Sequence, residues 1–227
     1  LQAKGARTDG RDADKRALVD RVFRHLTEAG CPGAAVSVAR GGELLFSSGY
    51  GLAQLEYDIP ISAATIFHVA SVSKQVTAFS VAVLAAEGSV SLDEDIRTYI
   101  PEAPDFGERI TLRHLAHHTS GLRDQWELLG MAGVRIDDVI TTDDILTLFK
   151  HQAELNFPPG SEFLYCNTGY TLLAEIVARV TGETFHDWTR DRLFIPLGMT
   201  DTHFHDDHRR IVPGRAYSYQ RVDDAYI

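Results

Sequence analysis

A serine and a lysine lie three residues apart in one of the most apolar stretches of the chain. The stretch FHVASVSKQVTAFSVAVLAAEG, residues 67–88, contains Lys74 and no other formal charge before Glu87. On a helix, Ser71 and Lys74 would project from the same side within one turn. Desolvation and the positive end of the helix dipole both favour the neutral lysine amine. Because a neutral amine is a competent general base, the pattern indicates a serine nucleophile activated by a lysine.

Ordinary helix building offers a second explanation of the same two residues. Ser71 would then be a helix N-cap, and the aliphatic stem of Lys74 would follow apolar surface until its ammonium reached water. An isolated S-x-x-K pattern favours this structural explanation, so the catalytic one needs a further motif.

The sequence YCN at residues 165–167 supplies that motif, between a Pro-Pro-Gly loop and an expected helix. A phenol beside a lysine can relay the serine proton to a leaving group, and an asparagine can hold both a substrate carbonyl and the lysine. The structural alternative makes Asn167 a helix cap and Tyr165 a core residue. About 0.015 chance occurrences are expected for both motifs together, which favours the catalytic explanation.

Four segments in this order resemble the class C β-lactamase-related serine hydrolases of the penicillin-binding protein superfamily: ASVSKQVTA, LRHLAHHTSGL, YCNTGY and LFIPLGMTDTHF. The resemblance implies Ser71 as the acylated nucleophile, Lys74 as the base, Tyr165 as a proton relay and Asn167 as a ligand of substrate and lysine. It also implies an α and β fold with a sheet lobe and a mainly helical lobe. No metal and no organic cofactor is expected. The implied enzyme hydrolyses a small-molecule or peptide substrate, such as a β-lactam, a D-amino-acid peptide or a short ester, in the periplasm or outside the cell.

The family's third motif, Lys-Thr-Gly or a variant of it on a strand beside the nucleophile, does not occur before Ile227. We therefore hypothesise a fragment, or one half of an assembly in which a second chain supplies the missing C-terminal strands. An alternative function is a penicillin-recognition or scaffold module that is acylated without turnover, or an inactive fragment that needs its partner half. A generic helical interaction protein is the third possibility.

Patterning along the chain predicts one incomplete domain over residues 13–227 after a disordered lead, residues 1–12. The sheet-lobe part, about 13–60, begins with a helix that has Leu18 and Leu26 on its apolar face and continues as a hairpin over residues 34–49. The mainly helical part covers about 61–227. Its helices are expected from Ser71 to Gly88 and within 92–102, 111–122, 141–150 and 168–182.

Composition excludes several other classes of function. A formal charge of −10 and a pI near 5.4 argue against nucleic-acid partners and anionic membrane surfaces. No apolar run is long enough to span a membrane.

Cys31 and Cys166 are expected to be small buried residues, with a single disulfide as the minority interpretation. His114, His117 and His118 are interpreted as structural, and the HFHDDH segment at 203–208 as an exposed loop without a metal. A G-x-S-x-G nucleophile elbow is absent from the sequence.

Overall fold

A computed structural model describes residues 10–135 and 137–227. The chain forms two compact units, Leu1–His68 with Ile211–Ile227, and Val69–Arg210. The predicted disordered lead lies outside the described residues over 1–9, and helix α1 (Gly10–Val22) begins within its last three residues.

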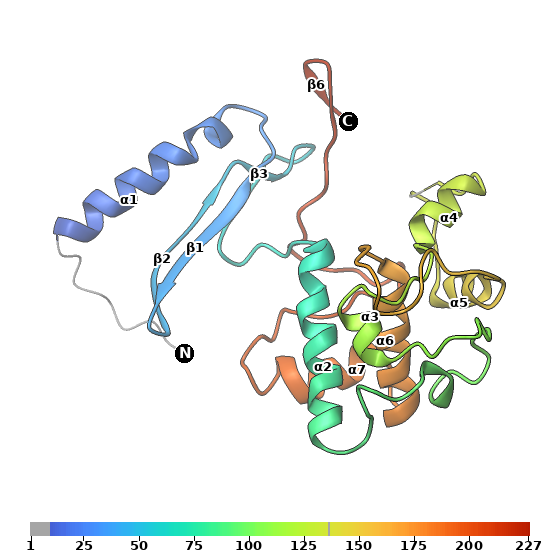
Figure 1. Ribbon diagram of the computed structural model, residues 1–227. Helices are drawn as coiled ribbons and strands as arrows, with labels where there is room; N and C mark the ends of the chain where they lie inside the picture. The colour runs from blue at the N-terminus through green and yellow to red at the C-terminus, as the bar shows by residue number, and fades with distance from the viewer. Residues whose placement is uncertain (1–9, 136) are drawn as a thin grey trace. The chain divides into compact units, whose positions relative to one another are not determined.

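A helix lying along a β-hairpin forms most of the first unit (Figure 1). Strands β1 (Ala34–Arg40) and β2 (Glu43–Tyr50) pair antiparallel around a turn in which Gly41 and Gly42 have φ of +57° and +81°. Glycine adopts this left-handed backbone without steric cost, so the Arg-Gly-Gly turn predicted from sequence is confirmed. Tyr50 attaches the hairpin to α1, because its Oη donates a hydrogen bond of 2.7 Å to Asp20.

Two further pairs of very short strands complete this unit: β3 (Leu52–Gln54) with β4 (Ile59–Pro60), and β5 (Arg221–Val222) with β6 (Ala225–Tyr226). A hydrogen bond joins the C-terminal segment of this unit to its N-terminal segment: the Tyr217 N–H donates to the Ala53 carbonyl at 2.8 Å. Among the described residues, β1 and β2 form a sheet of two strands only. The second chain expected beside them stays a prediction.

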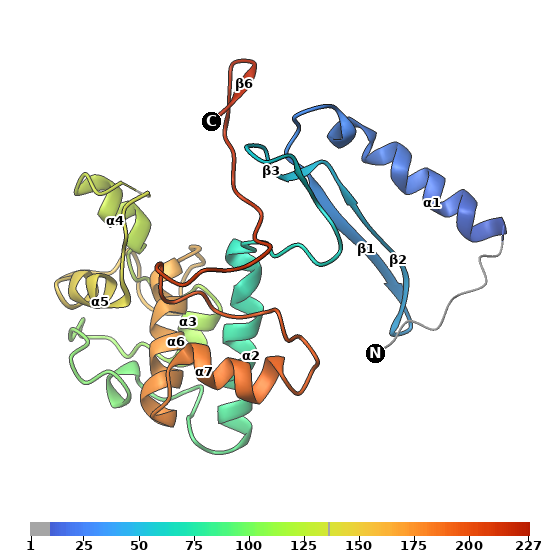
Figure 2. The same ribbon diagram turned by 180° about the vertical axis from the view of Figure 1, so that it is seen from behind.

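The second unit is helical, and α6 (Asn167–Thr181) runs through its centre beside α2 (Lys74–Ala86) (Figure 2). The buried face of α6 was expected from its apolar spacing, and Leu172, Leu173, Ile176 and Val177 on this face are fully buried. Helix α6 ends at Gly182, whose φ of +73° is the usual left-handed helix terminator. The remaining helical segments of this unit are η2 (Ala70–Ser73), η3 (Ile96–Thr98), α3 (Leu112–Ala116), α4 (Gln125–Met131), α5 (Thr142–Lys150), α7 (Phe185–Thr189) and η4 (Arg190–Phe194).

Helix α3 packs closely on α6 because a glycine lies at their contact. A Cβ at Gly169 would lie 3.3 Å from the Leu115 carbonyl oxygen, so the bare backbone allows this approach. The close packing matters for function, since α3 leads into the HTSGL segment and α6 begins at the YCN motif. No described helix is both long and apolar enough to cross a membrane.

Candidate active site

Ser71 lies on a single 3₁₀ turn, η2, that leads directly into α2. The turn is closed by three hydrogen bonds: Val72 N–H to the Val69 carbonyl at 3.1 Å, Ser73 Oγ to the Ala70 carbonyl at 2.6 Å, and Lys74 N–H to the Ser71 carbonyl. Ala70 adopts a φ of +45°, which costs a residue with a Cβ roughly 1–2 kcal/mol. Strained backbone of this kind is concentrated at functional sites, where the surrounding structure holds it in place.

The Ser71 hydroxyl receives two hydrogen bonds from the predicted partners. Lys74 Nζ donates to Ser71 Oγ at 3.1 Å, and Tyr165 Oη donates to the same oxygen at 2.7 Å. The Lys74 ammonium also lies 4.7 Å from the centroid of the Tyr165 ring. Both groups that could accept or relay the serine proton are thus within direct reach of the oxygen that would attack a substrate.

The surroundings of Tyr165 lower the pKa of its phenol. Burial of the phenol raises its pKa, but hydrogen bonds with Lys74 and Ser71 and the positive charge of Lys74 outweigh burial and bring the pKa below its usual value of 10. The side chain remains 44% exposed. A phenol with a lowered pKa at an accessible position is suited to transfer a proton between a serine and a bound molecule.

Asn167 is the first residue of α6 and gives Lys74 Nζ a second hydrogen-bond acceptor besides Ser71 Oγ. Lys74 Nζ donates to Asn167 Oδ1 at 2.8 Å, and Asn167 Nδ2 donates to Asp124 Oδ2 at 2.8 Å. The alternative roles drawn from the sequence do not match this arrangement. Ser73 and Cys166, rather than Ser71 and Asn167, are the N-cap residues of α2 and α6, and Tyr165 is not in the core.

The segment that carries Tyr165 is fastened to the HTSGL segment by backbone hydrogen bonds. Gly160 N–H donates to the Thr119 carbonyl at 2.7 Å, Leu164 N–H to the His118 carbonyl at 3.0 Å, and Asn156 N–H to the Gly121 carbonyl at 2.7 Å. The Pro-Pro-Gly loop and HTSGL, which are distant in sequence, therefore form one support for the phenol.

His118 supports Tyr165 in the structural role expected from the sequence. Its Nδ1 accepts the Cys166 N–H at 3.0 Å, and its ring lies 4.4 Å from the Tyr165 ring. Burial, followed by the charge of Lys74, lowers the pKa of His118, so the neutral ring with Nδ1 free to accept is favoured.

Sequence reasoning missed Asp124, which contacts Asn167. Its only signal was its position two residues after the HTSGL motif.

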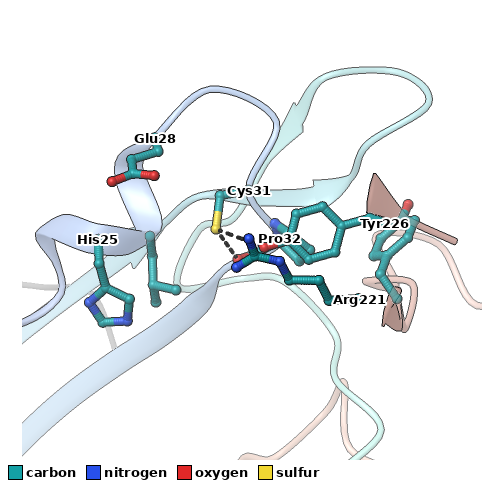
Figure 3. A pocket seen from close by; sticks show the side chains of 8 residues that line it. His25, Glu28, Cys31, Pro32, Arg221 and Tyr226 are labelled. Atoms are coloured by element: carbon teal, nitrogen blue, oxygen red, sulfur yellow. Dashed lines mark hydrogen bonds between the residues drawn. The ribbon is translucent and has the colours of Figure 1, made fainter. Parts of the chain in front are cut away.

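The other residues singled out from sequence lie elsewhere. Both cysteines are free; Cys166 is buried as expected, whereas Cys31 is partly exposed because it lines an open pocket of about 420 Å³ in the first unit (Figure 3). Cys31 Sγ lies 3.7 Å from Tyr226 Oη there, and none of the four predicted site residues lines this pocket. Across the described residues, no three His, Cys, Asp or Glu side chains gather as a metal centre requires, the segment 203–208 included.

Comparison with known proteins places this geometry in context. The model of the Beta-lactamase family matches residues 19–226. The chain is 30% identical over 217 residues to penicillin-binding protein 4* of Bacillus subtilis (strain 168), an alignment that covers 94% of this chain and 47% of that protein. It is 33% identical over 169 residues to a D-aminopeptidase of Brucella anthropi, covering 74% of this chain and 32% of the relative.

A solved structure of a related protein has a similar fold. The D-amino acid amidase of Ochrobactrum anthropi SV3, solved with L-phenylalanine, superposes with a TM-score of 0.74 at 29% identity, over 94% of this chain and 57% of that one. The chain thus spans about half the length, or less, of the curated relatives described above. These matches confirm the family resemblance and the α and β fold predicted from the four motifs.

Proposed function

The chain belongs to the Beta-lactamase family, and from this membership we propose that it is a serine hydrolase that acts on an amide or ester through acylation of Ser71. One observation carries the proposal: Ser71 Oγ accepts hydrogen bonds from both Lys74 Nζ, at 3.1 Å, and Tyr165 Oη, at 2.7 Å. A serine with two proton-transfer groups at hydrogen-bond distance has the geometry that an activated nucleophile requires.

In the proposed reaction, Lys74 acts in its neutral amine form as the general base. Ser71 Oγ attacks the substrate carbonyl carbon while its proton passes to this amine, which becomes an ammonium. Tyr165 relays a proton to the leaving amine or alcohol as the carbon–nitrogen or carbon–oxygen bond breaks, which leaves Ser71 as an ester. A water molecule then attacks this ester and gives up its proton to the same groups, releasing a carboxylic acid and restoring the Ser71 hydroxyl. Asn167 holds Lys74 in place and binds the substrate carbonyl.

We further propose a D-configured amino-acid amide or peptide as the substrate. The likeness to a D-aminopeptidase and to a D-amino acid amidase supports this class over short esters and β-lactams. Comparing hydrolysis of D-alanine and L-alanine p-nitroanilides tests the choice, because the proposal requires the D isomer to react faster. A periplasmic or secreted location is the matching proposal, which fractionation of the producing cells would test.

The decisive experiment is the intact mass of the protein after exposure to a reactive β-lactam and, in parallel, to a fluorophosphonate. We expect a single adduct that is lost in Ser71→Ala and retained in Ser73→Ala, a neighbouring serine of the same turn. An adduct in all three proteins, or in none while each is folded, would reject the proposed nucleophile. An adduct that forms in one burst without later turnover would favour the penicillin-recognition module instead.

A further inference from the structure

Asp124 is a buried carboxylate that holds two helix starts together. It is only 8% exposed, and its Oδ1 accepts the Trp126 N–H at 2.9 Å as the N-cap of α4. Its other oxygen, Oδ2, accepts both the backbone N–H and the side-chain Nδ2–H of Asn167 at the start of α6. Three N–H donors therefore offset the cost of removing this charge from water.

The amide of Asn167 lies between two opposite charges. Its Oδ1 faces the Lys74 ammonium and its Nδ2 faces the Asp124 carboxylate, both at 2.8 Å. Turning the amide by 180° would place its NH₂ against the ammonium and its carbonyl against the carboxylate, and both contacts would be repulsive. The contact with Lys74 and the contact with Asp124 thus favour the same orientation of the Asn167 amide. Of these two partners, Asp124 is the buried one.

On the basis of the proposed acylation of Ser71, we propose that Asp124 is a positioning residue for this reaction. It fixes the Asn167 amide with Oδ1 toward Lys74, and this acceptor in turn keeps Lys74 Nζ at hydrogen-bond distance from Ser71 Oγ. Asp124 itself touches neither the substrate nor the reacting atoms. Without it, the Asn167 side chain can rotate, and Lys74 Nζ loses its fixed second contact besides Ser71 Oγ.

Removing the carboxylate is expected to slow acylation by about 100-fold, the usual effect of misplacing a reacting group by about 1 Å. Asp124→Ala removes all three acceptor contacts. Asp124→Asn keeps the shape but has one acceptor oxygen, so its NH₂ must face either Trp126 N–H or the two Asn167 donors. We expect Asp124→Asn to lose less activity than Asp124→Ala, and it serves as the second variant if the alanine protein fails to fold.

A double-mutant cycle separates positioning from a general structural effect. If Asp124 acts through Asn167, the Asp124→Ala, Asn167→Ala double variant acylates no more slowly than Asn167→Ala alone, within about threefold. The acylation rate constant is measured by intact mass with the same β-lactam and fluorophosphonate. Losses that multiply across the two sites would overturn the proposal.

A second readout does not depend on acylation. The chain has two asparagines, Asn156 and Asn167, so labelling with ¹⁵N-asparagine gives two side-chain NH₂ pairs by NMR, which the Asn167→Ala variant assigns. We expect water exchange of the Asn167 pair to accelerate at least tenfold in Asp124→Ala and to stay unchanged in Thr141→Ala. Thr141 is a matched control, because it is also a helix N-cap in this unit and lies at the start of α5.

The two readouts distinguish the possible failures. An unchanged Asn167 signal in Asp124→Ala, or in Asp124→Asn if only that variant folds, overturns the positioning role even if Ser71 is acylated. A wild-type protein that forms no adduct rejects the proposed function, and the NMR comparison still decides whether Asp124 orients the amide.

Discussion

Replacing Gly121 by alanine tests how the HTSGL segment supports the site. Gly121 has a φ of +74°, and a Cβ there would lie 2.1 Å from the Phe157 carbonyl oxygen. That oxygen belongs to the backbone of the segment leading to Tyr165. The clash therefore cannot be relieved by rotating a side chain, and the two segments must move apart.

The expected loss of stability combines two contributions. The left-handed backbone costs an alanine about 1–2 kcal/mol. Separating the segments also breaks the 2.7 Å hydrogen bond from Asn156 N–H to the Gly121 carbonyl, for a further loss of about 1–3 kcal/mol if the groups stay buried. Gly88→Ala is the matched control, because Gly88 has a φ of +76° and no atom within 4 Å of its Cβ position.

Urea unfolding of both variants measures the difference. We expect Gly121→Ala to lower the free energy of unfolding by about 1–3 kcal/mol more than Gly88→Ala, since the strain of the left-handed backbone and the change in the unfolded chain are common to both. Acylation of Ser71 should slow in Gly121→Ala alone, because only that change displaces the support of Tyr165. Equal destabilisation by the two substitutions would refute the argument that this glycine is required for the close approach.

Two further predictions concern single side chains. Tyr165→Phe should slow acylation by about 10²–10⁴-fold with little change in the urea midpoint, because it removes the proton relay from a side chain that is 44% exposed; an unchanged rate by intact mass would exclude the relay. Glu102, whose pKa is lowered to about 2 by its hydrogen bonds with Arg179, should contribute stability above pH 4.5 that disappears as the pH falls toward 2. Because both side chains are about a third exposed, we expect an effect on the order of 1 kcal/mol. Urea unfolding of wild type and Glu102→Gln at pH 5 and pH 2 measures it, and a difference that does not shrink at the lower pH would contradict the assignment.

The sequence predicts the elements that are encoded locally. The buried face of α6 follows from the 3.6-residue spacing of Leu172, Leu173, Ile176 and Val177, and the hairpin turn follows from two consecutive glycines. Ser71 and Lys74 could be paired for the same reason, since three residues of helix fix their separation.

Contacts between distant segments could not be predicted in this way. Tyr165 reaches Ser71 because the loop before it is bonded to the HTSGL segment, and no local pattern encodes hydrogen bonds between two irregular segments. Asp124 resembles an ordinary helix N-cap in the sequence, a role that it also has. Its second role depends on the start of α6 lying beside it, which is a consequence of the packing of the whole unit.

Exposure decreases along the chain of contacts behind Ser71, the proposed nucleophile. Ser71 is exposed, Lys74 and Asn167 are half-buried, and Asp124 is buried. A nucleophile must be accessible to its substrate, and a side chain in water has rotational freedom that is costly to restrict. Lys74 is anchored through Asn167 to the Asp124 carboxylate, which is itself bonded to the starts of α4 and α6. The rotation of the Lys74 side chain is therefore restricted from the interior, where packing already holds the backbone. A substitution at the buried end should therefore reduce reactivity at the exposed end without replacing any residue that the substrate touches.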